Sequence, residues 1–387
     1  MMNGSPSLLT PDFHRRKVRQ IQARLDSEGL DGLLLLDVYN VIYASGFFHI
    51  PSERPLGMFI PASGDPALFV PQLELENASS SWIGDIRTYF EFPGEEHPVV
   101  WMVREAGVAR LGIDSLSLEV YRRLPTQPEI ILSPLVTQMR WIKDVEEIAL
   151  IQQAARYADF CLEQVRDHAA DIIKGGGTEL DILTQCISAT RAKMVAEVGE
   201  IFRLSGGSIV GTVHSGERAA LPHGSPIHRK PEIGDSLIAG IGASVGGYHA
   251  ESGATFLVDE VQWDRMRCLE AAAACDAATI EAARPGITCA EVNQIALDML
   301  REHGYHDSIR HRIGHGMGLQ GHEAPWLAPG DETRLAPGMV FSCEPGIYRP
   351  GLDGYRTIST LIVTNDAADV PSRFLIENPP ERRVLTL

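Results

Sequence analysis

Histidine and carboxylate side chains gather in four short stretches of the C-terminal two-thirds of the chain. These stretches cover residues 221–224, 247–251, 314–323 and 342–346. Imidazole and carboxylate groups are the side chains that most often move protons or hold metal ions. Glu344 follows the apolar run 339–341, and burying a carboxylate there without a partner would be costly. We therefore expect Glu344 to be matched by a cation, a proton or a metal ion.

The segments that carry these side chains are predicted to form an α+β domain. Apolar periodicity indicates helices starting near Glu146 and Thr178, and over 263–283 and 290–303. Extended segments are expected at 236–242, 247–258, 339–348 and 355–364. The stretch 309–322 is rich in Gly and His and cannot form a regular helix. We expect antiparallel strands that carry the polar side chains on their inward positions.

The first third of the chain is predicted to be a separate α/β domain, because helices and strands alternate along it. A helix is expected at 11–28, and strands at 33–36, 57–60 and 66–70. A further strand begins at Leu111 and is followed by a helix through Tyr121 and Leu124. A boundary falls within 139–145, so the predicted domains are 1–140 and 141–387.

Composition excludes several classes of protein. The 387 residues are 44% hydrophobic and 22% charged, which is typical of a globular chain and not of a disordered one. A net charge of −17 disfavours nucleic acid and anionic membranes as partners. No apolar run is long enough to span a membrane, and residues 1–20 lack a signal-peptide core. The six cysteines show no C-x-x-C spacing, which favours a cytoplasmic location.

Taken in order, the motifs resemble those of the creatinase, prolidase and aminopeptidase P family, over essentially the whole chain. The motifs are Arg140-Trp141-Ile142-Lys143, Gly234-Asp235, Gly247-Tyr248, Gly314-His315-Gly316, His322-Glu323-Ala324-Pro325 and Glu344-Pro345-Gly346. This resemblance implies an N-terminal creatinase-type domain followed by a C-terminal catalytic domain of pita-bread fold. It also implies a homodimer that acts on a small-molecule substrate.

The resemblance also predicts which ligands of the family's metal site are present in this chain. Peptidases of this family hold two metal ions with five ligands, and the matching positions here are Gly240, Glu251, His315, Glu344 and Ile358. Gly and Ile have no donor atoms, so a two-metal mechanism is not expected. Glu251, His315 and Glu344 would suffice for one divalent ion such as Mn, Fe, Co or Zn. We expect instead that they form hydrogen bonds in a site without a cofactor.

The main functional hypothesis follows from a metal-free relative, creatinase. It is a metal-independent hydrolase that cleaves a C–N bond in a small amino-acid-like, guanidino or amidino compound. His223 falls on the creatinase acid/base position, and His322 is expected to hydrogen-bond the developing oxyanion. Glu344 and Glu251 would activate water or bind a cationic group, with nucleophilic attack as the alternative for Glu251. Creatine itself is not predicted, because Gly253 stands at the other creatinase glutamate position.

Further residues are expected to bind the substrate. Arg54 aligns with an arginine that, in creatinase, reaches the substrate carboxylate from the neighbouring subunit. Trp326 replaces a second carboxylate-binding arginine, which suggests a more apolar pocket. Tyr248, His315 and Arg356 complete the set, with strand packing as the simpler role of Tyr248 and carboxylate orientation as that of Arg356.

Two other functions are consistent with the same residues. The first is a mononuclear-metal dipeptidase or aminopeptidase of Xaa-Pro type. The second is a non-catalytic protein that binds peptides or a partner. Retention of His223, His322 and Glu344 argues against the second.

Overall fold

The computed structural model describes residues 9–49, 51–199, 207–259 and 262–387. The chain separates into two compact units, one of which is Ser7–Arg140 and the other of which contains Trp141–Leu387. Both combine helices with sheets, so the predicted α/β domain followed by an α+β domain is confirmed.

The N-terminal unit is built on one mixed sheet with the strand order β4-β3-β2-β1-β5-β6. Strand β2 runs antiparallel to both of its neighbours, whereas the other pairs are parallel. The elements are α1 (Pro11–Glu28), β1 (Gly32–Leu35), α2 (Val38–Ser45), β2 (Gly57–Pro61), β3 (Ala67–Pro71), α3 (Leu75–Ala78), β4 (Asp85–Tyr89), α4 (Pro98–Ala106), β5 (Arg110–Ile113), α5 (Leu118–Tyr121), β6 (Glu129–Leu132) and α6 (Leu135–Trp141).

Helix α1 has the bounds that the sequence predicts, and local chemistry sets both of its ends. Thr10 accepts a hydrogen bond from the backbone N–H of Phe13, and Pro11 occupies the first helical position. Gly29 ends the helix at φ 63°, a left-handed conformation that glycine adopts without strain. The face with Val18, Ile21 and Leu25 is buried, as the periodicity predicts.

The C-terminal unit contains two sheets and a separate two-stranded ribbon. The strand orders are β17-β9-β8-β7 and β11-β10-β12-β15-β16, and β13 pairs with β14. The elements are α7 (Val145–Lys174), α8 (Glu179–Val198), β7 (Ser208–Ser215), β8 (Ser236–Val245), β9 (Tyr248–Val258), α10 (Trp263–Ala282), α11 (Cys289–Glu302), β10 (Gly314–Gly316), β11 (Glu323–Leu327), β12 (Val340–Cys343), β13 (Gly346–Arg349), β14 (Asp353–Arg356), β15 (Ser359–Val363), β16 (Ala368–Asp369), α12 (Phe374–Glu377) and β17 (Val384–Leu385).

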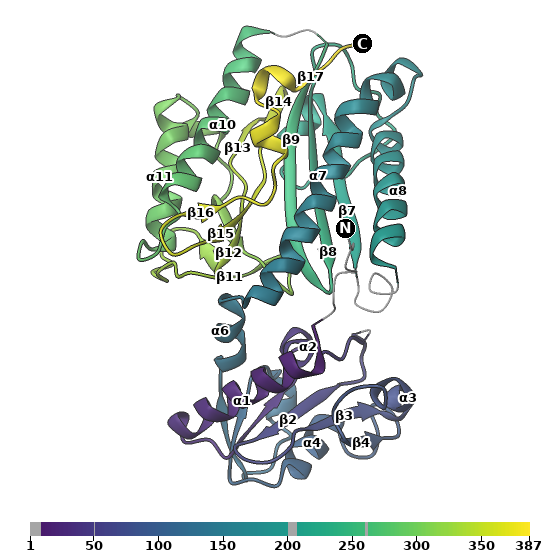
Figure 1. The fold of residues 1–387 in the computed structure, drawn as a ribbon, viewed down its shortest axis with the longest axis vertical. Helices are drawn as coiled ribbons and strands as arrows, with labels where there is room; N and C mark the ends of the chain where they lie inside the picture. Colours follow the sequence, from purple (N-terminus) through teal and green to yellow (C-terminus); the bar gives the residue numbers. More distant parts are fainter. Residues whose placement is uncertain (1–8, 50, 200–206, 260–261) are drawn as a thin grey trace, which may run out of the picture. The chain divides into compact units, whose positions relative to one another are not determined.

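Helices α7 and α8 lie along the sheet that contains the long hairpin β8–β9 (Figure 1). The start of α7 is tied to that hairpin through Glu147. One oxygen of Glu147 accepts the backbone N–H of Asp144 in a capping box, and the other accepts the hydroxyl of Tyr248 at 2.8 Å. The hairpin is therefore anchored where it turns, which orients the side chains of β9.

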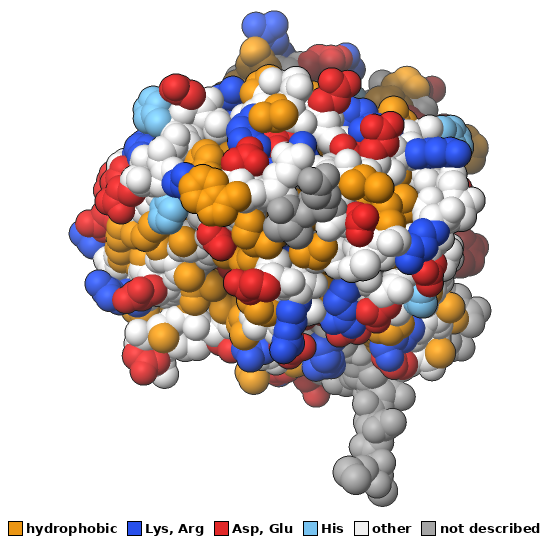
Figure 2. Space-filling view, turned by 90° about the horizontal axis from the view of Figure 1, so that it is seen from above, with side chains coloured by type: hydrophobic (Ala, Val, Ile, Leu, Met, Phe, Trp, Pro, Cys, Tyr) orange, Lys and Arg blue, Asp and Glu red, His pale blue; other side chains and the backbone are white. Residues whose placement is uncertain are grey.

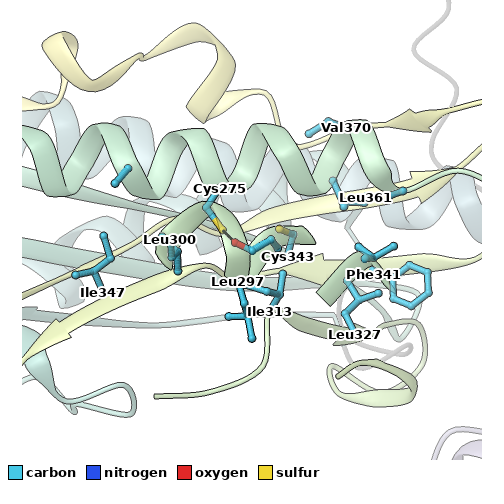
Figure 3. Packing of buried hydrophobic residues seen from close by; sticks show 14 of the residues in the cluster. Cys275, Leu297, Leu300, Ile313, Leu327, Phe341, Cys343, Ile347, Leu361 and Val370 are labelled. Atoms are coloured by element: carbon cyan, nitrogen blue, oxygen red, sulfur yellow. Dashed lines mark hydrogen bonds between the residues drawn. The ribbon is translucent and has the colours of Figure 1, made fainter. Parts of the chain in front are cut away.

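One hydrophobic core of the C-terminal unit lies between helices α10 and α11 and the sheet β11-β10-β12-β15-β16. Figure 3 shows Cys275 on α10 and Cys343 on β12 among apolar side chains that include Phe341, Leu361 and Leu297. All six cysteines are buried and have free thiols, which agrees with their predicted role as small core residues.

Two predicted strands are each divided in two. The segment expected as one strand over 339–348 forms β12 and β13, which belong to different sheets. The break falls at Glu344 and Pro345, because proline has no N–H for a continuing ladder. The segment expected over 355–364 is divided between Arg356 and Ser359, where Ile358 forms an isolated bridge with Gly253 of β9. Because of these breaks, Glu344 and Ile358 lie outside the regular strands of the sheets.

Several short elements of the N-terminal unit were not predicted. They are α2, α4, β4 and β6. Strand β4 and strand β6 are the two outer strands of their sheet and are mostly accessible to solvent, so they lack a long apolar run.

Charges of both signs are mixed on the face of the molecule shown in Figure 2, where basic side chains lie among acidic ones. No helix in the described part of the chain combines the length and the apolar character needed to cross a membrane.

A buried ion pair fixes the turn that precedes β11. The ammonium of Lys143 lies 2.9 Å from Glu323 Oε1, and the two side chains are only 2% and 4% exposed. Glu323 directly follows His322, so this ion pair holds one of the candidate site residues in place. Breaking a buried pair by removing one partner is strongly destabilising, because the remaining charge stays out of water.

We predict that Lys143→Met lowers the free energy of unfolding by about 3–5 kcal/mol, because it removes the ammonium that neutralises Glu323. Urea denaturation measures this loss. The exposed Lys230→Met variant is the control and should change stability by less than about 0.5 kcal/mol. The double variant Lys143→Met/Glu323→Gln should recover part of the loss. Equal stability of the two lysine variants would contradict this role of the pair.

Candidate active site

A cavity of about 840 Å³ in the C-terminal unit brings together most of the residues that the sequence singled out. Its walls come from the loop before β8, the segment that leads into β10, the turn before β11, and the ends of β12 and β14. The lining residues are Leu221, Pro222, His223, Arg310, His311, Arg312, Gly314, His315, His322, Ala328, Pro329, Glu344 and Arg356.

His315 is the centre of a cluster with two carboxylates. Its Nε2 lies 2.8 Å from Glu344 Oε1 and 3.8 Å from Glu251 Oε2. Its Nδ1 lies 3.0 Å from the carbonyl oxygen of Gly316, which can only accept a hydrogen bond. Nδ1 therefore carries a proton, and Nε2 is the nitrogen that faces both carboxylates.

The electrostatics of these three residues are coupled. Burial raises the pKa of Glu251, and the charge of Glu344 raises it further. Burial is also the largest influence on Glu344 and acts in the same direction, but the hydrogen bond with His315 and the positive charges of His315, Arg356 and His311 together outweigh it and lower the pKa of Glu344. Burial opposes the charged form of His315, yet the same hydrogen bond and both carboxylate charges raise its pKa. One positive charge is thus held between two acidic groups.

His322 completes a set of donors that fits a divalent metal ion. Its ring stacks on that of His315 with 3.7 Å between centroids. Glu251, His315 and His322 each offer one ligand atom, and these atoms all lie within 4.8 Å of one another. Two imidazoles and a carboxylate are a common ligand set for Fe, Mn, Co and Zn. The Nδ1–H bond from His315 to a backbone carbonyl is also the outer contact that orients a metal-binding histidine.

The two neighbouring positions that the resemblance assigns to metal ligands, Gly240 and Ile358, carry no donor atom in their side chains. Gly240 and Gly253 are paired across the β8–β9 hairpin, and the side chain of Ile358 fills the space beside them. A Cβ on Gly253 would lie 2.6 Å from Ile358 Cγ1, and one on Gly240 would lie 3.3 Å from Ile358 Cδ1. Ile358 is held there by paired backbone hydrogen bonds with Gly253. An apolar group therefore occupies this part of the site.

Arg356 connects the cluster to the loop that carries His223. It is 7% exposed, and its Nη1 donates to the carbonyl oxygen of Pro222 at 2.8 Å. Its charge also contributes to the low pKa of Glu344. His223 itself is exposed at the cavity wall, where it can meet a substrate.

The predicted site residues outside this group have other surroundings. Tyr248 is buried and donates to Glu147, and it is not among the residues that line the cavity. Trp326 lies beneath the guanidinium of Arg312, 4.6 Å from ring centre to Arg312 Cζ. Arg54 belongs to the N-terminal unit, where Glu53 and Glu91 pair with its guanidinium. Its role toward a substrate stays a prediction.

Sequence reasoning missed three contributors. Ser342 donates from Oγ to Glu251 Oε2 at 2.7 Å, and Thr360 Oγ1 accepts from the backbone N–H of Glu251. Arg312 is the third, and it lines the cavity. The only available signal was the basic run 310–312 directly before the Gly-His-Gly motif. Ser342 and Thr360 meet Glu251 only through strand register, which the sequence does not display.

Two family models cover most of the chain. The model of metallopeptidase family M24 matches residues 149–365, and the model of the creatinase/prolidase N-terminal domain matches residues 17–142. These matches confirm the predicted family, the creatinase-type N-terminal domain and the pita-bread C-terminal fold.

Individual relatives span nearly the same length. The chain is 31% identical over 366 residues to a probable dipeptidase PepE of Mycobacterium bovis, covering 92% of this chain and 94% of the relative. It matches the crystal structure of the dipeptidase PepE from Mycobacterium ulcerans with a TM-score of 0.84 and 27% identity, over 98% and 100% of the two chains. The prolidase from Pyrococcus horikoshii matches with a TM-score of 0.78 and 26% identity, over 92% and 98%.

These comparisons confirm a hydrolase that acts on C–N bonds, and they favour the peptidase alternative over the creatinase-like hypothesis. The expectation of a site without a cofactor is wrong. The matching family is one of metallopeptidases, and Glu251, His315 and His322 form a group able to hold an ion. Sequence reasoning counted the ligands lost at Gly240 and Ile358, but it had no means to see the second imidazole stacked beside the first.

We predict that Gly253→Ala destabilises the protein by about 1–3 kcal/mol, because the new methyl group overlaps Ile358. Ile358→Ala should be destabilising alone, but the double variant should be more stable than the sum of the two losses by at least about 1 kcal/mol. Chemical denaturation of all four proteins gives this coupling. Gly242→Ala, whose Cβ would have only an ordinary contact with Val210, is the matched control. Additive losses would contradict the packing described.

Proposed function

Because the chain belongs to metallopeptidase family M24, we propose that it is a metal-dependent peptidase that cleaves dipeptides, including those of Xaa-Pro type, with one divalent ion per chain. The observation that carries this proposal is the convergence of His315, His322 and Glu251 within 4.8 Å. The dipeptidase and prolidase relatives support the substrate class.

The proposed ligands are the imidazoles of His315 and His322 and the carboxylate of Glu251, with Glu344 beside them. His315 already presents Nε2 to the carboxylates, and Ser342 and Thr360 restrain Glu251. When bound, a divalent ion supplies polarisation of the scissile carbonyl and a bound water of lowered pKa. To act as a ligand, His315 would have to give up its proton at Nε2, so metal affinity should fall as the pH falls.

The chain's own residues supply proton transfer and positioning. Glu344 lies in the cavity wall with its pKa kept low, so it is ionised and its carboxylate can accept a hydrogen bond that orients a water molecule. His223 is exposed in the same cavity and is the group available to protonate the leaving nitrogen. Arg356 positions His223 through its hydrogen bond to the carbonyl of Pro222.

One ion, rather than two, is proposed from the packing around Ile358. A pair of bridging carboxylates would be needed to hold two cations about 3.5–4 Å apart. Gly240 and Ile358 bring no donor atom to the positions where the family resemblance expects carboxylates. The side chain of Ile358 lies against both glycines of the hairpin, and the guanidinium of Arg356 lies beside Gly240, so an apolar group and a positive charge occupy this region.

We predict that protein loaded with Mn²⁺, Co²⁺ or Zn²⁺ hydrolyses an Xaa-Pro dipeptide, and that chelation abolishes this activity. Glu251→Gln and His315→Ala should each lower metal affinity by at least about 10-fold and reduce turnover in parallel. Isothermal titration with the metal and product analysis by chromatography measure the two effects.

His303→Ala removes an exposed imidazole outside the cavity and is the matched control, which should behave as the wild type. Turnover that survives exhaustive chelation would contradict the proposed metal dependence. Unchanged metal affinity in both ligand variants would contradict the proposed ligands.

A gain-of-site variant tests the single-ion proposal from the opposite direction. Gly240→Asp/Ile358→Glu returns two carboxylates and removes the apolar side chain that now fills the space. We predict that this double variant takes up a second divalent ion, counted by elemental mass spectrometry on a protein verified as folded. The single variant Gly240→Asp keeps Ile358 and should still hold one ion. A double variant that is folded but still binds one ion would contradict the assignment of these positions.

A further inference from the structure

The candidate active-site cavity is positively charged although the chain as a whole is acidic. Three arginine and four histidine side chains line it, and Glu344 is the single carboxylate among its described lining residues. Over the whole chain, 51 acidic residues outnumber 34 basic ones. A cleft whose charge opposes that of its surroundings concentrates ligands of opposite sign. The cavity therefore suits a substrate with a negatively charged group.

Two of the three arginines are already engaged by the protein. Arg356 is nearly buried, donates to the carbonyl of Pro222, and has its charge offset by the neighbouring Glu344. Arg310 is exposed and directs Nη1 to carbonyl oxygens of its own loop, those of Asp307 and Ile309. Neither arrangement leaves a fixed guanidinium turned toward a ligand.

Arg312 differs from both because it is fixed but has no counter-ion. Its Nε donates to the carbonyl oxygen of Gly314 at 3.0 Å, and its Cζ lies 4.6 Å from the centre of the Trp326 ring. Within the described part of the chain, its Nη1 and Nη2 groups make no hydrogen bond and no ion pair with a carboxylate. A guanidinium held along one edge and over one face keeps its other edge free for a bidentate contact.

The support beneath Arg312 is itself rigid and belongs to the active site. Trp326 lies opposite His315 in the β10–β11 ladder, and its backbone N–H donates to Asp331 Oδ2 at 2.7 Å. Gly314, whose carbonyl holds the guanidinium, directly precedes His315. The positive charge of Arg312 also helps to lower the pKa of His322, after burial and the charge of His315. Arg312 is thus within electrostatic reach of the proposed metal ligands.

We propose that Arg312, supported by Trp326, binds the free C-terminal carboxylate of the peptide substrate. This inference rests on the proposed peptidase function and narrows its substrate class to short peptides with an unblocked C-terminus. Arg312 is the residue that contacts the substrate, and Trp326 is a positioning residue that acts through it. A planar guanidinium matches a carboxylate in shape and charge, whereas a C-terminal amide offers neither a negative charge nor two equivalent acceptors.

The test compares alanyl-proline with alanyl-prolinamide on metal-loaded protein. The wild type should prefer the free acid in kcat/KM by about 10- to 100-fold. Arg312→Met should lose most of that preference through a higher KM for the acid, with little change for the amide. Trp326→Leu should raise KM for the acid without lowering kcat, and Trp326→Phe should restore much of the loss. An equal loss on both substrates in Arg312→Met would overturn the proposal.

Arg310→Met separates a directed contact from a general charge effect. It removes the same charge two residues away, and we expect it to keep the wild-type preference within about threefold. Loss of the preference to the same extent in Arg310→Met and Arg312→Met would overturn the assignment to Arg312.

Calorimetric titration measures the affinity for proline and for prolinamide, so this part of the test does not depend on turnover. The wild type should bind proline more tightly than prolinamide by the same factor, and Arg312→Met should bind both alike. If neither peptide is hydrolysed but this difference is present and depends on Arg312, the carboxylate site stands and the peptidase proposal fails. If the wild type does not distinguish the two ligands, the carboxylate site is refuted.

Discussion

Two glutamate carboxylates face one histidine nitrogen in this protein. Keeping two negative charges largely out of water costs free energy, and the contacts around them offset that cost. Glu251 and Glu344 converge on His315 Nε2 with side chains only 19% and 17% exposed. Two neighbouring anions cannot both stay ionised in such a place without positive charge nearby. Here protonated His315 offsets the negative charge of the two carboxylates, and a divalent cation would offset more of it. The hydroxyl of Ser342 on β12 donates to the carboxylate of Glu251, and Thr360 on β15 holds the backbone of the same residue.

The scaffold around this cluster is rigid because its few irregular segments are each tied to a buried partner. Lys143 holds Glu323 and with it the turn of His322, while Arg356 holds the carbonyl of Pro222 and with it the loop of His223. The strand that would otherwise run from β12 into β13 is interrupted at Pro345, and this interruption frees Glu344 to face the cavity. Departures from regular structure therefore coincide with the functional side chains.

Local signals in the sequence were sufficient for the long helices of both units, but not for the short elements α2, α4, β4 and β6. The Thr10 and Gly29 caps bound α1, and the apolar run before Glu344 indicated a carboxylate in need of a cation. Contacts set by strand register were out of reach, because nothing along the chain shows that Ser342 meets Glu251. The same holds for the stacking of His322 on His315, so the wrong expectation of a metal-free site rested on the two ligand positions lost at Gly240 and Ile358.

The remaining donors are proposed to hold a single divalent ion. This proposal is tested most directly by counting metal ions per chain in the wild type, with elemental mass spectrometry after saturation and removal of weakly bound ions. We expect one bound ion per chain. Exhaustive chelation should remove this ion, and added Mn²⁺, Co²⁺ or Zn²⁺ should restore it. No retained ion under any of these conditions, or two ions held with similar affinity, would contradict the proposal.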